Sequence, residues 1–308
     1  MALTTTLVMV TRTYFSKTNI EKFLDSLDKI DEYLKPNWKK NKGFKRFFLT
    51  QHIFIFLVFS FNINTWIILT GIYDFHFHIF KHLYYYQISI NNALVYIFSC
   101  SIEYRFQQLS KKFTSEITEG DNSIQTMRIF NRMYMLLGKA IRFSNSVFGF
   151  SVLGTVCFVI VDLLMNASVL THFLISESGM APGFLKNALM ISARIGWMTF
   201  SLSLPTMLAI SCSGAMKAAR EVSEVCTEYL NLLPMVTTNQ RIKALKKQLR
   251  LLSAMSTSIK PFSAARFFTI NHSMLGLIIG SVPPYFIFML QCLQSETINY
   301  YNNESKSD

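Results

Sequence analysis

Two ionisable residues, Asp162 and Arg194, lie inside long apolar stretches of this 308-residue chain. A charge is costly in such surroundings, so an ionisable residue within a membrane-spanning segment is a candidate functional residue. Asp162 lies about eight residues from the C-terminal end of its stretch, and Arg194 about six or seven from the N-terminal end of its own. Each distance is roughly 10 to 12 Å in a helix, and we expect both ends on the outer side of the membrane. Their similar depth allows either a salt bridge between neighbouring helices or two polar groups in a pocket open to that side.

Aromatic residues accompany these charges. Trp197 follows Arg194 by one helical turn, and Phe200 follows Trp197, so both are candidates for the apolar walls of a ligand pocket that also holds Asp162 and Arg194. Three consecutive tyrosines, Tyr84, Tyr85 and Tyr86, begin another apolar stretch. We expect them to anchor that stretch at the membrane surface. The alternative is that their rings bind sugars or flat ring compounds.

Histidine and cysteine do not form a recognisable metal site. His76, His78 and His82 are close in sequence, which would suit a metal or a proton sensor. No acidic residue or cysteine completes such a site, and the five cysteines contain no C-x-x-C pair. We therefore predict no metal and no cofactor. Phosphate-binding loops and hydrolase motifs are also missing from the sequence, so an enzyme is not predicted.

The composition is that of a membrane protein. Hydrophobic residues make up 51% of the chain and charged residues only 16%, whereas soluble chains carry about 25% charged residues. The net charge of +12 would suit nucleic-acid binding, but the basic residues flank apolar stretches, as membrane topology requires. Nucleic acid is therefore not a predicted partner; membrane lipid is.

Five stretches are long enough to span a bilayer as helices, which takes about 20 residues. The second contains Gln87, Asn91 and Asn92 and is the least apolar. The sequence thus predicts an all-α, polytopic integral membrane helical bundle. The predicted spans are Phe47–Ile72, Leu83–Ile102, Val147–Leu170, Ala188–Ala215 and Phe267–Gln291.

Lysine and arginine predict the orientation of these spans. The segment before span one and the loops after spans two and four hold ten, seven and nine of them, 26 in all, against 3 in the other extramembrane segments. Basic loops stay in the cytoplasm, so we expect a cytoplasmic N-terminus and an extracellular C-terminus. Two N-x-S tripeptides, the acceptor pattern for N-glycosylation, fall at or beyond predicted outer span ends, at Asn166 and Asn303, and agree with this orientation.

The two long cytoplasmic loops are predicted to be helical. EYRFQQLSKKF continues the second span without Gly or Pro, and QRIKALKKQLRLLSAM carries apolar residues at 242, 245, 249 and 252, on one helix face. We expect these helices to pack together as a cytoplasmic subdomain or an assembly surface. The alternative is that the basic amphipathic helix lies on anionic lipid.

The last span carries a family signature. Its Tyr285, five hydrophobic residues and Gln291 resemble the C-terminal signature of insect gustatory receptors, with Pro284 and Cys292 replacing Thr and Phe. The segments FSAARFFTINHSMLGLIIG, VYIFSCSIEYRFQQLSKKF and RIFNRMYMLLGKAIRFSNSVFGFSVL also resemble parts of that family. The family has seven spans, and the first span here resembles its third, so we expect the family's first two spans to be missing.

The resemblance implies a map of the chain. It comprises a cytoplasmic N-terminal segment, 1–46; spans one to four, 47–215, with a cytoplasmic helical loop at 103–146; a second cytoplasmic helical loop, 216–266; a last pore helix, 267–291; and an extracellular tail, 292–308.

The resemblance also implies a function. Members are tetrameric ligand-gated cation channels, in which the last helix lines the pore and a tastant binds in a pocket open to the outside. Helical spacing places Pro284, Ile287, Phe288 and Gln291 on one face, and we expect that face to line the pore. Tyr285 and Met289 are expected to pack against neighbouring helices. We also expect Gly280, Pro283 and Pro284 to interrupt the helix, as a gating hinge or as a static bend.

The expected protein is therefore a taste receptor subunit in the plasma membrane of sensory neurons. Its expected partners are a small-molecule tastant and related subunits in a homo- or hetero-tetramer. One alternative is a secondary transporter that uses Asp162 and Arg194, although the repeated broken helices of transporters are not seen in the sequence. The other is a truncated receptor variant that does not conduct.

Overall fold

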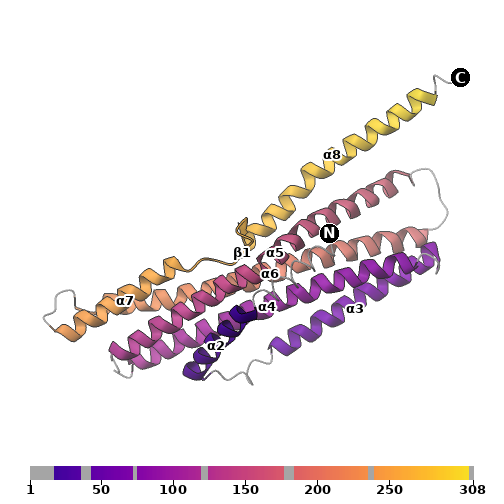
Figure 1. The fold of residues 1–308 in the computed structure, drawn as a ribbon. Coiled ribbons are helices and arrows are strands. Elements are labelled where there is room, and N and C mark those ends of the chain that lie inside the picture. Colours follow the sequence, from indigo (N-terminus) through magenta and orange to yellow (C-terminus); the bar gives the residue numbers. More distant parts are fainter. Residues whose placement is uncertain are drawn as a thin grey trace. The chain divides into compact units, whose positions relative to one another are not determined.

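The computed structural model describes residues 17–35, 43–71, 75–118, 124–176, 184–234 and 239–304, and this part of the chain is helical apart from short connections and one small hairpin (Figure 1). The elements in order are α2 (Lys17–Leu34), α3 (Gly43–Thr70), α4 (Phe75–Thr118), α5 (Ile124–Ser176), α6 (Phe184–Leu232), α7 (Gln240–Ser258), β1 (Ser263–Ala264), β2 (Phe268–Thr269) and α8 (His272–Glu304).

Several helices have the length and apolarity of membrane spans. Stretches at Leu49–Ile68, Ile124–Thr171 and Asn187–Leu232 are long and apolar enough to cross a bilayer, and a shorter apolar stretch occupies His272–Phe288. They contain four of the five predicted spans in whole or in part. The remaining one, Leu83–Ile102 in α4, does not reach the same measure within the described residues, as its three amide side chains lead us to expect.

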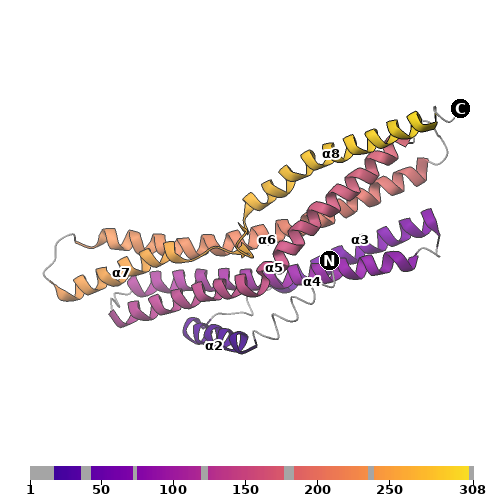
Figure 2. The ribbon, with the colours of Figure 1, turned by 45° about the horizontal axis from the view of Figure 1, so that its top comes forward.

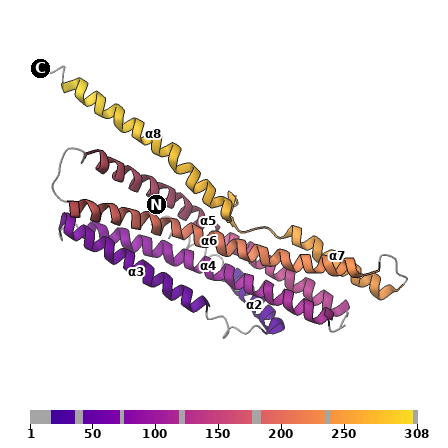
Figure 3. The same ribbon diagram turned by 180° about the vertical axis from the view of Figure 1, so that it is seen from behind.

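The chain divides into two compact units. Each of the helices α4, α5 and α6 contributes one part to unit 1 and the other part to unit 2. Unit 1 comprises residues 1–47, 90–153 and 207–272, and unit 2 comprises residues 48–89, 154–206 and 273–308. The views in Figures 2 and 3 follow the same helices from other sides.

Unit 1 contains the predicted cytoplasmic helices, which are packed together. Helix α4 continues to Thr118 as predicted, and its Phe106, Leu109 and Phe113 are buried. Tyr134 of α5 donates to the carbonyl of Ala219 in α6 at 3.0 Å, and Ser99 of α4 donates to Ser211 of α6 at 2.8 Å. Both contacts join helices that are distant in sequence.

Helix α7 is packed on its neighbours, as expected for the basic loop. Its Leu245, Leu249 and Leu252 are buried, at exposures of 4%, 1% and 2%. Asn131 of α5 donates to the side-chain oxygen of Gln248 at 2.8 Å. Burial of one face with exposed lysines and arginines on the other is the pattern of an amphipathic helix packed on its neighbours.

A two-stranded hairpin precedes α8 and corrects one predicted boundary. The last helix was expected from Phe267, but it begins at His272, after β1 pairs with β2 in antiparallel register. Ala265 and Arg266 have φ angles of 50° and 69°, which a right-handed helix does not allow. Phe267 N–H donates to the carbonyl of Ala264 at 2.9 Å, which closes the turn.

Helix α5 holds this hairpin. The side chain of Asn145 donates to the carbonyl of Pro261 at 2.8 Å and accepts from the Ser263 N–H at 2.9 Å. One turn further, Gly149 allows close approach, because a Cβ there would lie 2.8 Å from the Ala265 nitrogen. The segment that leads into α8 is thus fixed to α5 by backbone contacts within unit 1.

Unit 2 contains α3, the start of α4, the end of α5, the start of α6 and nearly all of α8. Helix α8 buries Met274 and Ile278. The expected interruption at Gly280 and the proline pair is not seen, since α8 runs unbroken to Glu304 with Pro283 and Pro284 inside it. Both prolines are exposed, and each lacks the N–H that a helical residue donates to the carbonyl four residues earlier.

Candidate ligand site

Asp162 of α5 is the centre of a buried polar cluster in unit 2. Asp162 is only 5% exposed. One carboxylate oxygen accepts from the hydroxyl of Tyr85 in α4, and the other accepts from the hydroxyl of Ser201 in α6 at 2.6 Å. Two hydroxyl donors from different helices thus stabilise the charge, as a buried carboxylate requires.

Arg194 of α6 joins the same cluster through an amide. Its guanidinium donates to the side-chain oxygen of Asn166 at 3.0 Å, and Asn166 donates to the backbone carbonyl of Asp162 at 2.7 Å. The guanidinium also lies 5.2 Å from the ring centre of Trp66 in α3. Among the described residues, no ion pair joins Arg194 to Asp162 directly, so the predicted salt bridge is replaced by a link through Asn166.

Asn166 was considered in the sequence as a glycosylation acceptor, and the structure corrects that interpretation. The residue is 1% exposed and both atoms of its amide are hydrogen-bonded. A glycosylated asparagine must reach the surface. The side chain of Asn303 lies outside the described residues.

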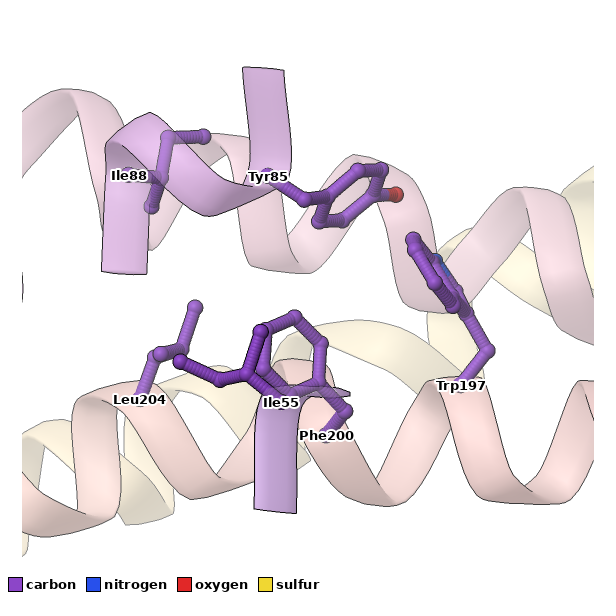
Figure 4. Close-up of a cluster of buried hydrophobic side chains, with 6 residues drawn as sticks. All are labelled: Ile55, Tyr85, Ile88, Trp197, Phe200 and Leu204. Atoms are coloured by element: carbon purple, nitrogen blue, oxygen red, sulfur yellow. The ribbon is translucent and has the colours of Figure 1, made fainter. Parts of the chain in front are cut away.

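Aromatic rings lie next to the polar cluster, and Figure 4 shows Tyr85, Trp197 and Phe200 within the buried hydrophobic cluster that they form. The rings of Tyr85 and Trp197 meet edge to face at 4.3 Å between centres, and Trp197 stacks on Phe59 of α3 at 5.6 Å. Trp197 and Phe200 are 2% and 1% exposed. Ile55, Ile88 and Leu204 complete the buried hydrophobic core next to them.

The structure therefore brings together the four residues that the sequence proposed as a pocket. Asp162, Arg194, Trp197 and Phe200 all belong to this cluster, to which Tyr85 contributes from α4. We call these residues, with Asn166 and Ser201, the Asp162 cluster.

The tyrosine run does not behave as three surface anchors. Tyr85 is 1% exposed and binds Asp162, whereas Tyr86 is 39% exposed and Tyr84 packs on Phe158 at 5.2 Å. Successive helical residues point about 100° apart, so only one of three can face the core fully. The expectation of interfacial anchoring is wrong for Tyr85.

Lys81, one turn before Tyr85, is a member that sequence reasoning missed. Its ammonium lies 5.6 Å from the ring centre of Tyr85 and 5.3 Å from that of Trp197. The signal that could have found it is its spacing of four from Tyr85 in a helix. From the sequence, Lys81 was only one of the three basic residues counted in the predicted extracellular segments.

The histidines do not form a metal site in the part of the chain that the structure describes. His82 is 5% exposed and packs between Phe59 and Trp197, at 5.0 and 5.3 Å between ring centres. No group of three potential ligands is found among the described residues. The side chains of His76 and His78 lie outside them.

The predicted pore residues lie on α8. Pro284, Ile287, Phe288 and Gln291 are all exposed, with Ile287 at 54% and Phe288 at 62%. Tyr285, which was expected to pack against neighbouring helices, is 59% exposed and is not covered by this chain. The side chain of Met289 lies outside the described residues. Whether the exposed face lines a pore stays a prediction.

These features define a polytopic helical membrane protein with a charged, aromatic-lined cluster inside its bundle. The chain belongs to the 7tm chemosensory receptor family, because the family model described as "7tm Chemosensory receptor" matches residues 1–296. A search of curated proteins gave no match. Membership establishes a membrane chemoreceptor, from a family of receptors and not of enzymes. The gustatory subtype remains a prediction.

Proposed function

We propose that this chemoreceptor is a gustatory receptor subunit that forms a ligand-gated, non-selective cation channel. A small tastant would bind at the Asp162 cluster and open a pore lined by α8. The assembly would be a homo- or hetero-tetramer with related receptors in the plasma membrane of sensory neurons.

The buried carboxylate carries this proposal. Asp162 lies in an apolar helix at 5% exposure and is held by hydroxyls from two other helices. A charged side chain is costly within a membrane, and such residues generally mark sites of binding or transport. Apolar walls with a few convergent polar groups are what small-molecule sites generally contain.

The shape of α8 supports the pore. The helix buries Met274 and Ile278 against its own chain, while Pro284, Ile287, Phe288 and Gln291 follow one another along an exposed face. An apolar ring of Ile287 and Phe288 would gate by dewetting, and a ring of Gln291 amides would offer oxygens to a hydrated cation.

Whole-cell recording tests the proposal. Cells expressing the chain are exposed to a panel of sugars, bitter compounds and small organic acids, beside cells with Gln291→Ala and with Gln240→Ala, an exposed glutamine of α7 that serves as control. We expect a tastant-evoked cation current whose relative permeability to Na⁺, K⁺ and Ca²⁺ changes with Gln291→Ala only. No current despite surface labelling, or an unchanged permeability with Gln291→Ala, would contradict the channel or the pore assignment respectively.

A further inference from the structure

The charges of the Asp162 cluster do not balance. Asp162 provides one negative charge, and Arg194 and Lys81 provide two positive charges that interact with it and with each other through space. The carboxylate is already satisfied by the hydroxyls of Tyr85 and Ser201. The cluster therefore has a net positive charge. Both oxygens of its carboxylate, on Asp162, already accept hydrogen bonds.

Both cations have donors to spare. A guanidinium and an ammonium each carry several N–H donors. Arg194 uses one in its bond to Asn166, and Lys81 has no hydrogen-bond or ion-pair partner within the described residues. Instead Lys81 lies over the rings of Tyr85 and Trp197. Lys81 is exposed, and such a cation–π contact is weaker than a hydrogen bond between charged groups.

Each cation lies against aromatic rings and precedes one of the cluster's aromatic residues by about one helical turn. Lys81 precedes Tyr85 by one turn of α4, and Arg194 precedes Trp197 by one turn of α6. Asn166 follows Asp162 by one turn of α5. A molecule held by both cations would thus have its remaining body against Trp66, Tyr85 or Trp197.

We propose that the Asp162 cluster binds small organic anions: a carboxylate or similar acidic group, between Lys81 and Arg194, on a flat apolar body that contacts the aromatic rings. This deepens the proposed function by naming the class of its ligand, and it rests on that function. A protonated amine is disfavoured because it would bring a third positive charge and would have to displace Lys81 from its rings.

Binding is measurable without any current. The purified chain in lipid nanodiscs contains three tryptophans, two of which contact Lys81 or Arg194, so ligand binding should change its fluorescence. The probes are three molecules of one shape and different charge: 3-phenylpropionate, 3-phenylpropionamide and 3-phenylpropylamine. We expect the carboxylate to bind at least about tenfold more tightly than the amide, and the amine most weakly.

Two variants assign the preference to its residues. Lys81→Gln and Arg194→Gln should each weaken carboxylate binding about tenfold and leave amide binding nearly unchanged, so the preference falls in each and vanishes in the double variant. Lys243→Gln, an exposed lysine of α7, is the matched control and should bind as the native chain does. Failure of the carboxylate to bind, equal or tighter binding of the amide or amine, or a preference that survives the double variant would overturn the proposal.

The two proposals fail separately. Carboxylate-selective binding without any evoked current would leave the ligand class standing and contradict the channel. Currents evoked by neutral compounds, together with no charge preference in the binding assay, would leave the channel standing and contradict the ligand class.

Discussion

Each unit of the molecule has a carboxylate centre that joins helices, Asp31 in unit 1 and Asp162 in unit 2, and the two are built in opposite ways. In unit 1, Arg105 of α4 donates two hydrogen bonds to the carboxylate of Asp31 in α2, from Nε at 2.8 Å and from a terminal nitrogen at 2.7 Å. Another N–H of Arg105 donates to the hydroxyl of Ser101. In unit 2, Asp162 takes its hydrogen bonds from hydroxyls, and the cations near it are not paired with it.

The difference separates a charge that is fully paired within the chain from one that we propose to be functional. The pair in unit 1 is complete: a bidentate arginine uses the geometry of both groups fully, and Lys112 adds a bond from its ammonium to the backbone carbonyl of Tyr33 at 2.8 Å. The cluster in unit 2 keeps cationic donors that nothing in the described chain uses. The centre with unused donors is therefore the one that we propose as the ligand site.

The largest expected effect is on the complete pair. Arg105→Gln should lower the free energy of unfolding by about 3 kcal/mol, because it leaves Asp31 without its partner at a contact where Arg105 is almost fully buried. Thermal unfolding of the purified chain measures this. Lys111→Gln, at an exposed position of the same helix, is the control, and an equal effect there would show that the pair is not special.

The hydroxyl donors of the second centre come next. Tyr85→Phe removes one donor from a carboxylate with 5% exposure, and leaving it unmet should cost about 1 to 3 kcal/mol. Tyr86→Phe alters the neighbouring exposed ring and should cost almost nothing. Similar unfolding temperatures for the two variants would mean that the bond between Tyr85 and Asp162 does not stabilise the chain.

Arg194→Gln sharpens the comparison, since it should change the free energy of unfolding by less than about 1 kcal/mol. The arginine makes one hydrogen bond and one ring contact, and its loss is offset by removing a charge from an apolar region. The same unfolding assay gives the value beside Arg105→Gln. A loss as large as that of Arg105→Gln would make Arg194 a structural residue and remove the contrast.

The smallest effect concerns a third carboxyl, Glu103 in unit 1. Burial, followed by the charge of Glu221, raises the pKa of Glu103 above its ordinary value of 4.5. A raised pKa favours the protonated folded chain, so the stability from this group is present below pH 4.5 and is lost as the pH rises through the raised pKa. Glu103→Gln mimics the protonated form. The unfolding temperature of this variant minus that of the native chain should therefore increase from pH 4.5 towards neutrality. A constant difference would be the contrary result.

Much of the candidate site was predictable because membranes make polar residues conspicuous. Asp162 and Arg194 stand out in apolar stretches, and Trp197 and Phe200 follow at helical spacing. Tyr85 was not separable from Tyr84 and Tyr86, since the rotation of a helix is set by what packs on it. Asn166 looked like a surface acceptor, because a tripeptide does not reveal burial. The break at Gly280 and the prolines was expected and is not there, because local propensity does not decide whether a helix continues.

The order of residues was sufficient to establish an all-helical membrane bundle, since the length and apolarity of a span follow from the bilayer and not from neighbours. It also fixed the buried face of α7, where spacing of three and four is a local property. Only the tertiary structure decided which groups meet. Asp162 finds hydroxyls from α4 and α6, Arg194 reaches Asn166 instead of Asp162, and Lys81 lies over two rings. Those pairings depend on the rotation and relative height of three helices, α4, α5 and α6, and residues distant in sequence carry no signal of either.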